Sequence, residues 1–244
     1  MKKKEWFETW FDSHYYHLLY QNRNNEEASL FIGNLITALK LPENSKLLDL
    51  ACGKGRHSVT LANHGYDVTG VDLSTNSIDS AKNFEHEHLR FSVQDMRVPF
   101  ATNEFDAVLN LFTSFGYFDD LNDNEKVIVA IREMLKANGL LVIDFMNSMS
   151  VIDQLVTSEK KTIEGIQFSI EREYDGSHIY KHIRFSDQEK DFHFTERVQA
   201  LMYSDFKCLL EAQGFEIIRT FGNFDLMDFD PKTSDRLILI AQRS

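Results

Sequence analysis

Short runs of apolar residues alternate with amphipathic stretches through the middle of the chain. The run from Lys46 to Ala51 is mostly leucine and leads into glycines at positions 53 and 55, which predicts a buried strand, a tight turn and a helix over about 56–64. The same alternation continues as far as Phe145. Strands that alternate with helices are typical of a parallel sheet with helices on both faces, so we expect a doubly wound α/β fold.

The pattern changes to a period of two after the fifth apolar run. Apolar and polar residues alternate over 166–170, 179–185 and 192–198. Such alternation is typical of strands with one buried face, so we expect a three-stranded antiparallel sheet. We interpret residues 149–201, which contain it, as an insertion within a single domain of residues 1–244 and as a candidate lid.

One more helix and two strands are expected after the insertion. The helix covers 203–213 and ends at Gly214, since glycine favours the left-handed conformation that closes a helix. Apolar runs over 215–220 and 237–241 predict the last two strands.

The beginning of the chain is rich in aromatic side chains and precedes a predicted helix over about 26–39. Tyrosine can bury its ring and still place its hydroxyl group, so this segment suits either core packing or a binding site. The aromatic residues are Trp6, Phe7, Trp10, Phe11, Tyr15, Tyr16 and Tyr20.

Charge and cysteine content narrow the class of partner. The chain of 244 residues has a formal net charge of −12, which would repel a nucleic acid, and its clearest basic run is the three lysines at 2–4. It has no apolar run of membrane-spanning length and no apolar segment typical of a secretory signal. Cys52 and Cys208 are the only cysteines, so we expect no disulfide framework, no metal site and a cytoplasmic location.

Two acidic residues flank the glycine loop. Asp49 lies inside the first predicted strand, four positions before the first glycine, and Asp72 ends the next strand. A carboxylate in a buried strand is costly unless a partner satisfies it, whereas glycine lets a ligand approach the backbone. The loop therefore predicts a site for a ligand with amine and hydroxyl groups.

The pattern Asp49-x-x-x-Gly53-x-Gly55, followed by Asp72, resembles the cofactor signature of class I S-adenosylmethionine-dependent methyltransferases. Three later stretches resemble the same family in the same order, namely the acidic turn 94–96, the fourth strand 104–111 and the helix, glycine and strand of 135–144. The resemblance covers roughly residues 47–144, and several motifs in register are more specific than any one of them.

A nicotinamide or flavin site is the alternative interpretation of the glycine loop. Its fingerprint requires a third small residue, which Ser58 provides, and Asp72 would bind a ribose in either case. Asp49 favours the methyltransferase, because the dinucleotide fingerprint has no acid within the first strand. A glycine turn with a purely structural role would leave both acids unexplained.

The resemblance implies an enzyme with a seven-stranded, mostly parallel sheet of order 3-2-1-4-5-7-6 and with S-adenosyl-L-methionine as cofactor. It also implies that an N-terminal helical cap, residues 1–40, folds over that cofactor. Asp49 would hold the cofactor's ammonium group and Asp72 its ribose hydroxyls. The implied cofactor-binding residues are Tyr15, Tyr16, Asp49, Cys52, Gly53, Gly55, Arg56, Asp72, Leu73, Gln94, Asp95, Met96 and Leu111.

Candidates for the acceptor site lie at the carboxyl ends of the parallel strands, where open α/β sheets bind ligands. Phe115 and Tyr117 follow the fourth strand. The polar face of the inserted sheet carries Arg184, His193 and Arg197, which would suit an acidic acceptor. Tyr117 and His193 are the candidate catalytic residues, and a solvated sheet face or plain loop packing is the open alternative.

We expect the acceptor to be a small molecule, because an aromatic segment and a lid would enclose it. Methylation of RNA or of a protein is the enzymatic alternative. A module that binds the cofactor without turnover is the non-enzymatic one.

Overall fold

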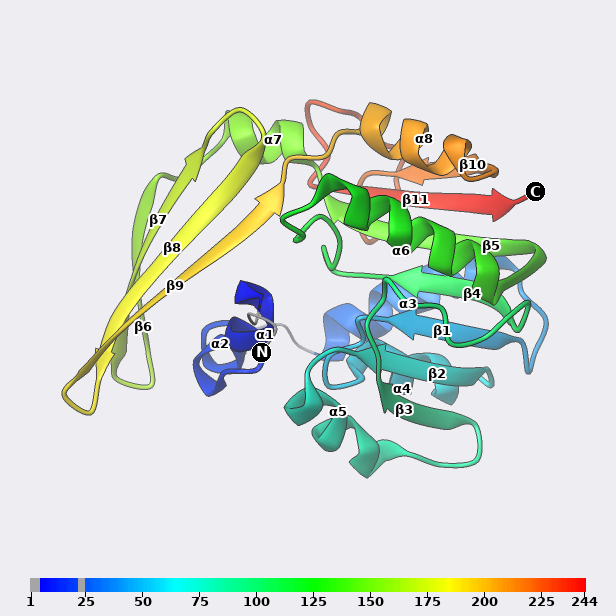
Figure 1. The fold of residues 1–244 in the computed structure, drawn as a ribbon, viewed down its shortest axis with the longest axis horizontal. Coiled ribbons are helices and arrows are strands. Elements are labelled where there is room, and N and C mark those ends of the chain that lie inside the picture. Colours follow the sequence, from blue (N-terminus) through cyan, green and yellow to red (C-terminus); the bar gives the residue numbers. More distant parts are fainter. Residues whose placement is uncertain (1–4, 22–24) are drawn as a thin grey trace.

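The computed structural model describes residues 5–21 and 25–244, and the N-terminal lysines at 2–4 lie outside them. Its body is a seven-stranded sheet of order β10-β11-β5-β4-β1-β2-β3, which confirms the predicted order. Neighbouring strands from β5 to β3 pair in parallel, and β11 pairs antiparallel with both β5 and β10 (Figure 1). The strands are β1 (Lys46–Leu50), β2 (Asp67–Asp72), β3 (Leu89–Val93), β4 (Phe105–Asn110), β5 (Leu135–Met146), β10 (Phe215–Phe221) and β11 (Arg236–Arg243).

Helices cover both faces of this sheet because successive strand residues point to opposite sides. Leu47 of β1 packs with one group of helices, and the next residue, Leu48, packs with the other. The first group comprises α3 (Asn25–Leu39), α4 (Arg56–Asn63) and α5 (Thr75–Ala81), and a short 3₁₀ helix, η1 (Lys82–Phe84), follows α5. The second comprises α6 (Leu121–Met134) and α8 (Tyr203–Ala212).

The inserted sheet has four strands where the sequence pattern predicts three. They pair antiparallel in the order β6-β7-β8-β9 and follow a short helix, α7 (Ser148–Asp153). The unpredicted strand is β6, an edge strand whose sequence SEKKTI is mostly polar and solvent-facing, so it lacks the apolar alternation that marks the other three. The strands are β6 (Ser158–Ile163), β7 (Ile166–Tyr174), β8 (His178–Asp187) and β9 (Lys190–Gln199).

A third hydrophobic core joins the inserted sheet to the start of the chain. Helices α1 (Trp6–Trp10) and α2 (His14–Leu19) lie beside this sheet (Figure 1). Trp10 and Leu18 pack with Phe168 and Ile183, although more than a hundred residues separate them in sequence. We call α1, α2 and strands β6–β9 together the cap. No helix in the described part of the chain is long and apolar enough to cross a membrane.

Candidate active site

A cavity of about 600 Å³ lies between the carboxyl ends of the parallel strands and the cap. In Figure 1, β1, β2 and β4 run towards α1, α2 and the inserted sheet. The cavity wall includes Asp49 and Gly53 from the glycine loop region, Asp72 at the end of β2, and Lys181 and Glu196 from the inserted sheet. Residues from three distant parts of the sequence therefore meet at one site.

The two glycines of the loop have different surroundings. Gly53 has φ +57° and lines the cavity, and a Cβ built on it would meet nothing within 4 Å. Gly55 has φ +80° and does not line the cavity, and a Cβ there would lie 2.6 Å from the ring of Phe91. Gly55 therefore lies outside the lining of the cavity, and its missing Cβ makes room for Phe91.

Asp49 is buried next to a hydroxyl group. Its carboxylate is 1% exposed and accepts a hydrogen bond of 2.5 Å from Ser58 Oγ. Burial raises the pKa of the Asp49 carboxyl to about 6, and the Ser58 hydrogen bond opposes this shift. A cationic group in the cavity would stabilise the ionised form, so the site suits an ammonium group at this point.

Asp72 is held by backbone groups on both of its oxygens. Its Oδ2 accepts from Gly53 N at 2.8 Å, and its Oδ1 accepts from Ser74 N at 2.8 Å. Burial raises the pKa of Asp72, and these backbone hydrogen bonds oppose the shift. Each carboxylate oxygen has a second lone pair, so Asp72 can also accept from two hydroxyl groups of a ligand.

Asp95 lines the cavity and also closes a turn. It accepts from Arg97 N at 3.0 Å and from the Arg97 guanidinium at 2.7 Å. Arg97 further pairs with Asp123 at 2.7 Å and with Glu5, just before α1, at 2.9 Å. This ion-pair cluster connects the N-terminal end of the cap to the wall of the cavity.

The structure brings most of the predicted cofactor residues together around the cavity. Those that line it are Tyr16, Asp49, Cys52, Gly53, Arg56, Asp72, Leu73, Gln94, Asp95, Met96 and Leu111. Tyr15 lies outside, because α2 turns it towards the inserted sheet, where its ring packs on Phe185 and its hydroxyl group donates to Asp187 at 2.9 Å. The structure therefore does not bring Tyr15 to the cavity with the other predicted cofactor residues.

The predicted acceptor residues are mostly misplaced. Tyr117 lines the cavity, whereas Phe115 is buried against Phe206 beneath α8. Arg184, His193 and Arg197 lie on the opposite face of the inserted sheet from the cavity; Arg184 pairs there with Glu171 and Arg197 with Asp119.

The inserted sheet turns its apolar face towards the cavity, and not the polar face that carries the predicted acceptor residues. Its apolar face packs on α1 and α2, and at one end of that face Arg172, Lys181 and Glu196 reach the cavity. Each stands two residues from an apolar neighbour on its own strand, so a charge within an apolar alternation was the available signal.

Glu196 is the centre of a hydrogen-bond network at the cavity wall. Its carboxylate accepts from Trp10 Nε1 at 2.7 Å and from the hydroxyl group of Tyr20 at 2.7 Å. Lys181 lies 3.8 Å from the same carboxylate and 4.4 Å from the centre of the Tyr20 ring. These contacts fix the carboxylate among aromatic rings of the cap.

His57 is expected to make the protein less stable in acid. It is 8% exposed at the cavity wall, and burial and the charge of Arg56 lower its pKa from 6.5 to about 3. As the pH falls from about 6.5 to 3, His57 is protonated in the unfolded chain before it is protonated in the folded protein. Its contribution therefore lowers the free energy of unfolding by roughly 4 kcal/mol.

The His57→Gln variant isolates this contribution. We expect the free energy of unfolding, measured by denaturant titration at pH 7 and pH 3, to fall more for the wild type than for the variant. The extra fall should be roughly 4 kcal/mol. Taking the difference removes the opposing contribution of Asp49, whose pKa is raised. A difference that is constant with pH would show that burial does not perturb His57.

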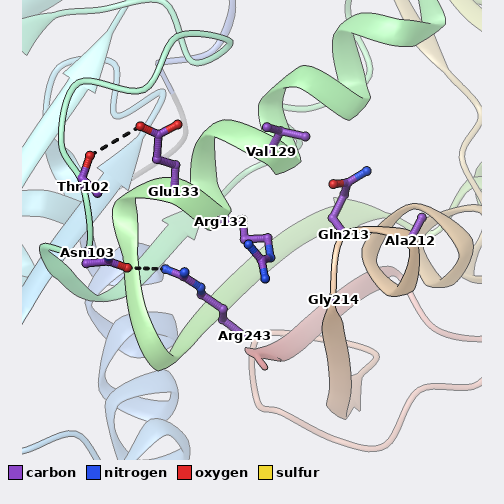
Figure 2. Close-up of a pocket in the computed structure, with 9 residues that line it drawn as sticks. All are labelled: Thr102, Asn103, Val129, Arg132, Glu133, Ala212, Gln213, Gly214 and Arg243. Carbon is purple, nitrogen blue, oxygen red and sulfur yellow. Dashed lines mark hydrogen bonds between the residues drawn. The ribbon is translucent and has the colours of Figure 1, made fainter.

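A second hollow, of about 490 Å³, lies at the other end of the parallel strands (Figure 2). Arg132 and Gly214 line it, and Arg243 donates there to Asn103 at 2.7 Å. None of the predicted site residues lines this hollow.

Comparison with known proteins finds methyltransferases. A family model described as a methyltransferase domain matches residues 48–143. The chain is 30% identical over 212 residues to the glycine/sarcosine N-methyltransferase of Aphanothece halophytica, which covers 83% of this chain and 76% of that protein. It is 29% identical over 215 residues to the putative methyltransferase YqeM of Bacillus subtilis (strain 168), with 84% and 86% covered.

A solved structure has the same fold. It is an S-adenosylmethionine-dependent methyltransferase from Clostridium acetobutylicum ATCC 824, which superposes with a TM-score of 0.79 at 22% identity over 94% of this chain and 96% of that one.

Proposed function

Because the chain belongs to the class I S-adenosylmethionine-dependent methyltransferases, with S-adenosylmethionine as methyl donor, we propose that it methylates the amine nitrogen of a small molecule. The acceptor would be enclosed between the glycine loop and the cap. The observation that carries this proposal is the carboxylate of Glu196, held at the cavity wall among aromatic rings.

The cofactor would occupy the half of the cavity that the acids around the glycine loop line. We propose that Asp49 binds the ammonium group of the cofactor and that Asp72 accepts from its ribose hydroxyls. Leu73 and Met96 would flank the adenine, and Arg56 would bind the cofactor carboxylate. The second oxygen lone pairs of Asp72 and the buried charge of Asp49 support these roles.

The acceptor half of the cavity is suited to an amine. Phe11, Tyr16, Tyr20 and Tyr117 present aromatic rings to it, and such rings attract cations through their faces. Glu196 adds the negative charge that would bring an ammonium group to this place. The glycine/sarcosine N-methyltransferase to which the chain is similar is named for methyl transfer to amine nitrogen, which supports the same acceptor class.

Alignment is the main task of the protein in this reaction. The sulfonium of the cofactor supplies an activated methyl group, so the chain has to hold the amine in line with it, an effect worth about 7–11 kcal/mol. The amine must lose its proton before it attacks. We propose that Glu196 binds the ammonium form and accepts the proton.

The proposal predicts the outcome of an acceptor screen. With labelled S-adenosylmethionine and a pool of small metabolites, we expect label in amines, and in none of the matched alcohols or thiols. Glu196→Gln should lower kcat/KM for such an amine roughly 10- to 150-fold, because loss of a charge-assisted hydrogen bond costs about 1.5–3 kcal/mol.

Glu171→Gln is the matched control for that variant. Glu171 lies on the opposite face of the same sheet, where it pairs with Arg184, so its loss should leave turnover unchanged. Label transferred only to RNA or protein, or equal kinetics for Glu196→Gln and wild type, would refute the proposed acceptor.

We also propose that α1 and α2, within the predicted cap of residues 1–40, and strands β6–β9, within the insertion of residues 149–201, close the cavity as parts of one domain. Their shared core and the Glu196 network support this assignment. Cys52 and Cys208 are both free, which supports the proposal of a cytoplasmic location.

A further inference from the structure

We propose that the ion pair between buried Asp144 and partly buried Arg236 is a positioning device for methyl transfer, which holds the turn Phe112–Thr113 against the cavity. Asp144 lies near the end of β5 and Arg236 begins β11, the antiparallel neighbour of β5. The turn follows β4 and lines the cavity next to Leu111. This inference goes beyond the proposed amine, since it applies to any acceptor that enters the cavity.

The turn has a backbone conformation that its residues do not favour. Phe112 has φ +64° and Thr113 has φ +57°. Positive φ is uncommon in residues other than glycine and is an outlier for a bulky or β-branched residue. Such a conformation persists only where the surrounding structure holds it, and it occurs often at functional sites.

Asp144 provides two of the bonds that hold the turn. Its side-chain Oδ2 accepts from Phe112 N at 2.8 Å, and its backbone carbonyl accepts from Thr113 N at 2.9 Å. The Asp144 carboxylate is fully buried and does not line the cavity. It therefore acts on the site only through the turn.

Arg236 completes the arrangement from the other side. Its Nε donates to Asp144 Oδ1 at 2.8 Å, and its Nη2 donates to Thr113 Oγ1 at 3.1 Å. The guanidinium also lies 5.8 Å from the centre of the Phe112 ring and 5.5 Å from that of Phe224. A planar fork can make these contacts together, whereas a lysine ammonium is a single point charge.

The position of this turn matters for the rate of methyl transfer. Phe112 and Thr113 form the wall between the glycine loop and Tyr117, whose hydroxyl group donates to the Thr113 carbonyl at 2.5 Å. A shift of about 1 Å in a reacting geometry can cost on the order of 100-fold in rate. Arg236 also lines the cavity, but its guanidinium is bonded to Asp144 and Thr113 and not to Asp49 or Asp72, whose hydrogen bonds are to other groups, so we expect the effect to fall on kcat.

The test compares Arg236→Lys and Arg236→Met with wild type. Three quantities are measured: hydrogen exchange of the Phe112 and Thr113 amides, affinity for S-adenosylhomocysteine by calorimetry, and kcat for an amine that the wild type methylates. We expect amide exchange at the turn to be at least about 10-fold faster and kcat to fall about 10- to 100-fold. Affinity for S-adenosylhomocysteine should stay within about two-fold.

Arg243→Met is the matched control. Arg243 lies at the other end of β11, where it donates to Asn103 and to the Leu135 carbonyl, far from the cavity. We expect a lower melting temperature for this variant, with unchanged exchange at the turn and unchanged kcat.

Thr113 gives a second pair of variants. We expect Thr113→Val to lower kcat as the Arg236 variants do. Thr113→Ser should keep kcat near that of the wild type, because serine keeps the hydroxyl group to which Arg236 donates.

Variants of Arg236 that lower only the melting temperature, with wild-type exchange at the turn and wild-type kcat, would overturn the proposal and leave the pair a structural one. If no amine is methylated by the wild type, the amine proposal fails, while the exchange measurement still decides whether the pair holds the turn. Unchanged exchange of the two amides would then overturn the positioning role by itself.

Discussion

Replacement of Gly55 by alanine is expected to destabilise the fold by about 2–4 kcal/mol. About 1–2 kcal/mol arises from the left-handed backbone, at φ +80°, and the rest from forcing a Cβ against Phe91, which would lie 2.6 Å away. Phe91 cannot move aside easily, because its ring also packs closely against Gly70, where an added Cβ would likewise lie 2.6 Å from it. Thermal unfolding should show a melting temperature lower by about 5–15 °C.

Gly53→Ala is the control within the same loop. Its φ is also positive, but no atom lies within 4 Å of the added Cβ, so we expect a cost of only about 1 kcal/mol in stability. Its effect should appear instead in weaker binding of S-adenosylhomocysteine, because Gly53 lines the cavity. Adding Phe91→Leu to Gly55→Ala should recover part of the lost stability. Equal stability of the two alanine variants would contradict the assignment of Gly55 to packing.

Loss of the Asp72 carboxylate is expected to weaken cofactor binding strongly. In Asp72→Ala, two charge-assisted hydrogen bonds to the ribose hydroxyls would be absent, at a cost of about 1.5–3 kcal/mol, or roughly 10- to 150-fold in Kd. The backbone N–H groups of Gly53 and Ser74, which donate to this carboxylate, would lose their partner as well. Calorimetric titration with S-adenosylhomocysteine measures the change.

Asp67→Ala serves as the control for this variant, since Asp67 begins the same strand at the end away from the cavity. It should bind S-adenosylhomocysteine as the wild type does. An Asp72→Ala protein that folds and binds with wild-type affinity would show that Asp72 only fixes the glycine loop.

The sequence was sufficient to predict which residues around the glycine loop meet at one cavity. Asp49, Gly53 and Asp72 lie within one strand, one loop and the next strand, so their relation is local and the family signature describes it directly. The sheet order was implied by the same resemblance to the family, and the structure confirms it. The structure adds that Gly55, within the same signature, serves packing against Phe91.

The acceptor half could not be predicted in the same way. Period-two alternation shows that a strand has two faces, but which face meets the cavity depends on what packs against it. Here the first helices of the chain cover the apolar face, so Glu196 and Lys181 reach the cavity while Arg184 and Arg197 point away from it.

The sequence by itself thus determined the fold of the body, the methyl donor and the glycine loop that we propose binds it, because the family signature lies in residues close together in the chain. Only the tertiary structure decided the cap and the wall opposite the cofactor. The contact between Trp10 and Glu196 and the pairing of Asp144 with Arg236 join segments that are distant in sequence. The geometry of such contacts is set by the packing of whole elements, which no local pattern records.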